Sequence, residues 1–149
     1  MTKYQFTLVK GHQVASGLAN DPRFPHGTIA AQQPYFLALG LNLDGFYPAT
    51  LNAQFNCTSV NITCHDYYFQ QVQWHPKMPP EDFKFTRCYI IANQQRYGAL
   101  VYQPLLATKT EHFQARNQLE LLAPYINNIS YGDHLAIEVT SKTLIMVKR

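Results

Sequence analysis

Apolar and polar residues alternate along several short stretches of the chain, a period of two that is typical of β-strands with one buried face. The first stretch is the clearest, because Tyr4, Phe6 and Leu8 are separated by Gln5 and Thr7. The same alternation predicts further strands around residues 51–55, 67–69, 89–91 and 135–139, and short apolar stretches predict strands at 97–102, 119–122 and 144–147. The chain is therefore expected to form a mainly β domain of many short strands, as in a small barrel or sandwich.

A short helix is also predicted, from Gln33 to Gly40. Pro34 would stand near its start, where a missing N–H costs least, and Gly40 would supply the left-handed residue after the last turn. The preceding residues 11–28 are rich in Gly, Pro, Asn and Asp, so they are expected to form a long loop. Such loops often contact ligands.

The composition is that of one ordered domain. With 149 residues, of which 46% are hydrophobic and 14% charged, the chain can bury one core, so residues 1–149 are expected to form a single domain. The net charge of +3 comes from scattered basic residues, which argues against a nucleic-acid partner. No stretch has the apolar length of a signal peptide or membrane span, so a cytoplasmic protein with no membrane partner is expected.

The cysteines and histidines form no recognisable catalytic or metal-binding pattern. Cys57, Cys64 and Cys88 are odd in number and include no C-x-x-C pair, so they are expected to be reduced core or edge residues. The six histidines fall at no metal-ligand spacing. Neither a zinc site nor a cysteine nucleophile is expected.

Two segments have the residue types that bind phosphorylated ligands. Thr50 and Asn52 flank Leu51 in a predicted strand, so both point to one face, where hydroxyl and amide oxygens suit a hard cation such as Mg²⁺. The small residues around Gly17 would let backbone N–H groups approach a phosphate. Both features also occur as purely structural ones, and the residues alone leave that choice open.

Several short motifs follow one another along nearly the whole chain: Ser16-Gly17-Leu18, Gly45-Phe46, Tyr47-Pro48-Ala49-Thr50-Leu51-Asn52, Lys109-Thr110-Glu111-His112, Leu119-Glu120-Leu121-Leu122-Ala123-Pro124 and Gly132-Asp133. In order and approximate spacing they resemble motifs of the CTP-dependent riboflavin kinases. That family carries S-G-x-G-x-G, then Y-P-G-T-L-N, K-T-x-H, E-I-I-A-P and D-G-D. Each motif is short, and the resemblance rests on their shared order.

The resemblance implies a fold, a reaction and a set of site residues. The fold would be a six-stranded cradle-loop β-barrel with one or two short helices. The reaction would transfer the γ-phosphate of CTP to riboflavin, giving FMN, with Mg²⁺ held by Thr50 and Asn52. The other implied contacts are Ser16, Gly17 and Leu18 over the triphosphate, Thr110 and Glu120 on the flavin, and Tyr125 and Asn128 along the cytidine nucleotide.

The sequence departs from the family in segments that would contact phosphate. Ala19 and Asp21 occupy the second and third glycine positions of the loop, which restricts the backbone and brings a carboxylate toward a triphosphate. Ala49 replaces the glycine before Thr50, and Asn127-Asn128 stands where the family has Leu-Arg. Three functions stay open: a divergent kinase, a catalytically silent flavin- or nucleotide-binding module, and a protein-interaction or regulatory domain.

Overall fold

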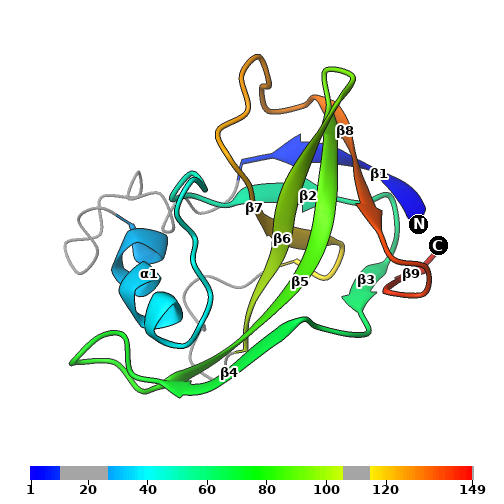
Figure 1. The fold of residues 1–149 in the computed structure, drawn as a ribbon. Coiled ribbons are helices and arrows are strands. Elements are labelled where there is room, and N and C mark those ends of the chain that lie inside the picture. Colours follow the sequence, from blue (N-terminus) through cyan, green and yellow to red (C-terminus); the bar gives the residue numbers. More distant parts are fainter. Residues whose placement is uncertain (11–26, 106–114, 149) are drawn as a thin grey trace.

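The computed structural model describes residues 1–10, 27–105 and 115–148, and within them the chain forms one helix and nine strands. The mainly β fold with a short helix that the sequence predicts is thereby confirmed (Figure 1). No helix in these ranges is long and apolar enough to cross a membrane. The elements are β1 Thr2–Val9, α1 Thr28–Ala38, β2 Leu51–Gln54, β3 Ser59–Ile62, β4 Tyr67–Val72, β5 Glu81–Ala92, β6 Gln95–Leu105, β7 Gln118–Leu122, β8 His134–Val139 and β9 Leu144–Val147.

Six of the described strands close into a ring. Their order is β5-β6-β7-β2-β1-β8, and β8 pairs back with β5, so that every strand of the ring has two antiparallel neighbours. β4 adds to the free part of β5, whereas β3 and β9 pair with each other in a separate two-stranded sheet. Closure of the ring protects strand edges that would otherwise be free to pair with another chain.

The period-two pattern of the sequence separates the two faces of the ring. Residues such as Phe6, Ala53 and Leu121 point inward and are almost fully buried in one core. Their neighbours along each strand, such as Thr7, Asn52 and Glu120, point outward and are half-buried. Burial of the inward set explains why the alternation could be read as strands.

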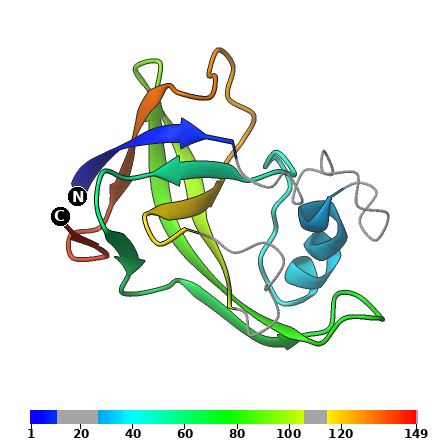
Figure 2. The same cartoon turned by 180° about the vertical axis from the view of Figure 1, so that it is seen from behind.

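Helix α1 packs on the outside of the ring over a second core. The ring of Phe36 meets Phe83 and Phe85 edge-on, with centroids 4.9 and 5.0 Å apart. Figures 1 and 2 show α1 outside the ring and the following segment running past it into β2. The buried residues Leu41 and Leu43 of that segment complete the second core. The helix and this segment therefore cover the outer face of β5 and β6.

The helix begins at Thr28, five residues before the predicted start at Gln33, so that boundary was wrong. Pro34 lies inside the helix rather than near its start. The buried residues Ile29 and Phe36 stand seven apart on one face, and their packing against the sheet outweighs the lost hydrogen bond at Pro34. Residues 11–26 of the predicted loop lie outside the described residues.

The predicted end of the helix is correct. Gly40 has a φ of 101°, the left-handed conformation that favours glycine. The Gly40 N–H donates to the Leu37 carbonyl at 3.1 Å, and the Leu41 N–H donates to the Phe36 carbonyl at 2.9 Å. These two hydrogen bonds satisfy carbonyls of the last helical turn, and Leu41 joins Phe36 in the second core.

Two features of the sheet were not predicted from the sequence. β3 is short and alternates weakly, and its four residues pair with β9 far along the chain. β5 and β6 form a long hairpin around Asn93 and Gln94, whose φ angles of 51° and 63° match a two-residue turn of type I′. Because Gln is not a usual residue in such a turn, the sequence gives little sign of it.

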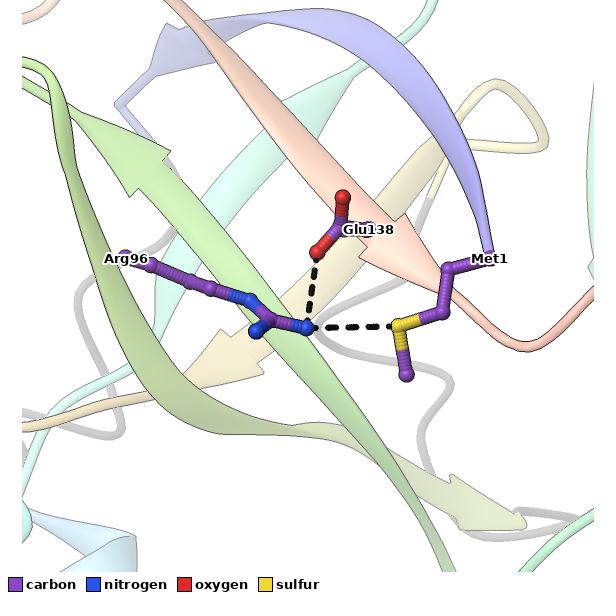
Figure 3. Close-up of polar contacts among 3 residues, drawn as sticks. All are labelled: Met1, Arg96 and Glu138. Carbon is purple, nitrogen blue, oxygen red and sulfur yellow. Dashed lines mark hydrogen bonds and ion pairs between the residues drawn. The ribbon is translucent and has the colours of Figure 1, made fainter.

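An ion pair joins strands where the ring closes between β5 and β8. The Arg96 guanidinium on β6 lies 3.0 Å from the Glu138 carboxylate on β8 and also donates to the Met1 sulfur at 3.4 Å (Figure 3). The same guanidinium stacks on the Tyr89 ring, 3.6 Å from its centroid. These contacts link β5, β6 and β8 to the residue that precedes β1.

Candidate functional site

Three oxygen-bearing side chains meet on the outer face of β2 and β7. Asn52 in β2 lies directly opposite Glu120 in β7. Thr50, just before β2, donates its hydroxyl hydrogen to Glu120 Oε1 at 3.2 Å. All three residues are half-buried, so they combine a fixed position with access to solvent. We refer to Thr50, Asn52 and Glu120 as the oxygen cluster.

Strand geometry positions the cluster. Leu51 packs against the inner core, which leaves Thr50 and Asn52 on the outer side, as the sequence predicts. The segment before β2 is also tied to the end of β7, because the Tyr47 N–H donates to the Ala123 carbonyl at 2.9 Å. Thr50 is thus held beside β7 by backbone contacts as well as by its own hydroxyl group.

A buried polar pair lies beside the cluster on the same outer face of the sheet. Tyr102 in β6 is directly opposite Glu120, and its hydroxyl donates to Gln32 Oε1 on α1 at 2.7 Å. Both side chains are almost fully buried. Burial, and then the carboxylates of Glu120 and Glu81, raise the pKa of Tyr102 well above its ordinary value. Tyr102 therefore remains protonated and links α1 to the strand next to Glu120.

An exposed aromatic pair lies beside the same strand ends. Tyr47 and Tyr125 are 52% and 62% exposed, and their rings meet edge-on with centroids 5.3 Å apart. Tyr125 is one of the residues that the resemblance placed at the nucleotide. Tyr47 belongs to the segment from Phe46 to Asn52 that the sequence marks as a candidate ligand site, but its pairing with Tyr125 could not be predicted, because it depends on the contact between the segment before β2 and the end of β7.

The other candidate residues are not brought to the cluster. Asn128 is exposed with a φ of 60°, and the preceding Asn127 carbonyl accepts a hydrogen bond from Asn93 at 2.9 Å, which places this turn at the β5–β6 hairpin tip. The tip lies beyond the start of β6, about 25 Å from Tyr102 at the usual rise of a strand. Ser16, Gly17, Leu18 and Thr110 lie outside the described residues.

The donor set of the cluster fits a hard cation. Hydroxyl, amide and carboxylate oxygens are the ligands that Mg²⁺ takes in proteins, with water and substrate phosphates filling the remaining positions. The Thr50 hydroxyl gives its hydrogen to Glu120, so its lone pairs remain for a metal. Across the described ranges no group of three or more His, Cys, Asp or Glu residues could hold a metal ion. A cation here would depend on one carboxylate and two neutral oxygens.

The cysteines are all free thiols, as the sequence predicts, and two of them are buried. Burial raises the pKa of Cys88 to about 12, so this thiol stays protonated at neutral pH. Cys64 is exposed and lies 3.5 Å from the Thr143 hydroxyl.

Taken together, fold and cluster define a mainly β protein with a closed six-stranded ring, a covering helix and a half-buried set of oxygen ligands on its outer face. No protein-family model matches the sequence, and a search of curated proteins finds no significant relative.

Proposed function

We propose that this protein is a divergent riboflavin kinase-like phosphotransferase on a cradle-loop β-barrel, using Mg²⁺ and CTP to convert riboflavin to FMN. The observation that carries the proposal is the convergence of Thr50 and Asn52 with Glu120, which is 70 positions from Thr50 in the sequence but lies beside both residues across β2 and β7. The resemblance implies that Thr50 and Asn52, from one motif, are metal ligands and that Glu120, from a second motif, is a flavin contact. Their meeting at one place supports a single site.

Each residue of the oxygen cluster would have a distinct task. Thr50 and Asn52 would direct neutral oxygens at the cation, and the bound Mg²⁺ would neutralise phosphate charge. Glu120 would orient the Thr50 hydroxyl and accept a hydrogen bond from the hydroxyl group that receives the phosphate. Phosphoryl transfer depends mainly on positioning and charge neutralisation, which is what such a cluster can supply.

The direct test is a chromatographic assay for FMN. The protein would be incubated with riboflavin, Mg²⁺ and either CTP or ATP in separate tubes. Formation of FMN with CTP is the expected result. Formation of FMN only in the tube with ATP would change the assigned nucleotide from CTP to ATP. Absence of FMN in both tubes would overturn the kinase proposal.

One variant tests the metal site while leaving the stability of the fold nearly unchanged. Asn52→Leu should lower Mg²⁺-dependent CTP affinity about tenfold or more, because it removes one oxygen ligand, while the melting temperature stays nearly unchanged. The matched control is Asn61→Leu, the same replacement at an exposed position of β3. Equal CTP affinity in the two variants, measured by calorimetry, would remove the metal assignment from Asn52.

A second candidate is a flavin- or nucleotide-binding module that performs no transfer. The exposed Tyr47–Tyr125 pair favours it, because exposed aromatic rings offer surfaces for a planar ring to stack on. Ala19 and Asp21 also favour this second candidate, because they replace two glycines of the family's phosphate loop and would make triphosphate binding less favourable. In this case riboflavin fluorescence is quenched without turnover. Tyr125→Ala should abolish the quenching, whereas Tyr131→Ala, at another exposed tyrosine, should not.

A further inference from the structure

A concave site, separate from the oxygen cluster, lies next to it on the outer face of the ring. It has a volume of about 340 Å³ and is lined by Thr7, Gln54, Phe55, Asn56, Asn117 and His134. This volume is at the lower end of the range for small-molecule sites. No residue of the oxygen cluster lines it.

Strand register explains why these side chains meet. Thr7 on β1 is directly opposite Gln54 on β2 and, on its other side, directly opposite His134 on β8. Thr7 therefore lies between Gln54 and His134, each about 5 Å away at the usual strand spacing. The Phe55 N–H donates to the Asn117 carbonyl at 2.8 Å, which holds the segments after β2 and before β7 together at the end of the pocket.

The lining is rich in hydrogen-bonding groups that carry no fixed charge. Three amides, one hydroxyl and one imidazole face the pocket, and Phe55 is buried, so it offers no exposed ring face. Thr7 and His134 contact each other at 3.3 Å. The amides of Gln54, Asn56 and Asn117 make no side-chain hydrogen bond to any residue in the described ranges, so their donors and acceptors remain for a ligand.

We propose that this pocket binds an uncharged polyhydroxylated molecule, a sugar or a sugar alcohol. Each hydroxyl group of such a ligand is both donor and acceptor, which matches amides that present a donor and an acceptor side by side. An anion or a cation finds no fixed opposite charge in the lining. A nucleobase finds no ring to stack on, although stacking is the usual basis of base binding to proteins.

The pocket is a neighbour of the oxygen cluster but does not depend on its proposed role. Gln54 is two residues from Asn52 on the same face of β2, about 7 Å away along the strand. A sugar-sized ligand could therefore occupy the pocket while the cluster is filled or empty. Binding here can be measured without any nucleotide, flavin or metal.

The experiment is a titration of the ¹⁵N-labelled full chain followed by NMR. Sorbitol and glucose serve as probes, one linear and one cyclic, and trimethylglycine serves as a hydroxyl-free solute. Saturable shifts of the Thr7, Gln54 and His134 amides with either sugar probe, and none with trimethylglycine, are expected. Shifts that rise linearly without saturation, or that trimethylglycine reproduces, would overturn the proposal.

Variants locate the site. Thr7→Val and Gln54→Leu should each weaken sugar binding about fivefold, the usual effect of one net hydrogen bond. Gln5→Leu is the matched control, because Gln5 is an exposed residue on the same face of β1 that does not line the pocket. Asn56→Ala, outside any strand, is a further test that leaves the ring intact. Unchanged affinity in Thr7→Val, Gln54→Leu and Asn56→Ala would overturn the assignment.

The outcome is separable from that of the proposed kinase function. Asn52→Leu should keep sugar binding and lose Mg²⁺-dependent CTP affinity, whereas Gln54→Leu should do the reverse. Sugar binding that persists in a protein with no FMN formation supports the pocket and rejects the kinase.

Discussion

The two faces of β2 and β7 carry opposite kinds of side chain. Ala53 and Leu121 point inward and are fully buried in an apolar core, whereas Asn52 and Glu120 point outward and are half-buried and polar. On β5 and β6 the outer face is instead apolar and covered by α1. The inward residues are explained by folding alone. The polar residues on the outer face of β2 and β7 do not contribute to either core. Their convergence next to the part of the sheet that α1 covers therefore marks them as a candidate binding site.

Removal of an inward side chain should give the largest effect on stability. Leu121→Ala deletes a side chain with no exposed surface, so we expect it to lower the free energy of unfolding by about 2–5 kcal/mol. Chemical denaturation measures this change. Leu37→Ala, at an exposed helix position, is the control and should stay within about 0.5 kcal/mol. Equal effects of the two variants would contradict the assignment of Leu121 to the core.

The buried link between α1 and the ring should give the next largest effect. Tyr102→Phe removes the hydroxyl that donates to Gln32 and leaves the Gln32 oxygen buried without this donor. We expect a loss of about 1–3 kcal/mol in the free energy of unfolding. Tyr131→Phe, at an exposed tyrosine, should change stability little. A Tyr102 variant as stable as the native protein would show that α1 is held by its apolar contacts alone.

Tyr102 also predicts how stability depends on alkaline pH. Its pKa is raised in the folded protein above the ordinary value of 10.0, so the unfolded chain loses the proton first as pH rises. Titration of this group has no effect below about pH 9, and above pH 10 it lowers the free energy of unfolding progressively. Denaturation curves between pH 8 and 11 should fall less steeply for Tyr102→Phe than for the native protein. Parallel curves would contradict this prediction.

An exposed ion pair should contribute less than either buried contact. Arg96 and Glu138 are 50% and 20% exposed, and pairs of this kind contribute about 0–1 kcal/mol. Glu138→Gln should therefore lower the free energy of unfolding by less than about 1 kcal/mol, and the difference should shrink at high salt. Thermal denaturation at low and high salt measures it. A salt-independent loss above 2 kcal/mol would mean that the pair is a main support of ring closure.

The sequence predicts the strands that alternate, because burial of one face leaves a period of two along the chain, and those that form short apolar runs, because both of their faces meet apolar neighbours. It did not predict β3, since Ser59 and Asn61 are polar and the strand depends on its partner β9. The predicted start of α1 was wrong for a related reason. Ile29 is buried by tertiary packing, and no local sequence pattern at Thr28 indicates that a helix begins there. Elements and boundaries that depend on long-range contacts, such as β3 and the start of α1, could therefore not be predicted from local patterns.

The candidate site shows the same limit. Thr50 and Asn52 could be paired from the sequence, because two residues that flank a third on a strand share a face. Glu120 joins them only through the pairing of β2 with β7, a contact between residues about 70 positions apart. Tyr102 stands at the end of an apolar run that predicts only a strand. No sequence pattern predicts the burial of Gln32, because that burial depends on the packing of α1 against β6.

The smallest effect on stability should come from the residue expected to matter most for binding. Thr50→Val keeps the shape of the side chain and removes the hydrogen bond to Glu120, which is accessible enough to be hydrated instead, so stability should stay within about 0.5 kcal/mol. The rise in melting temperature caused by Mg²⁺ and CTP together should largely disappear, because a bound ligand stabilises only a protein that can hold it. Thr50→Ser retains the hydroxyl and should restore that rise. If Thr50→Val is stabilised by Mg²⁺ and CTP as much as Thr50→Ser is, the outer face of β2 has no role in cation binding, and its polarity reflects only exposure to water.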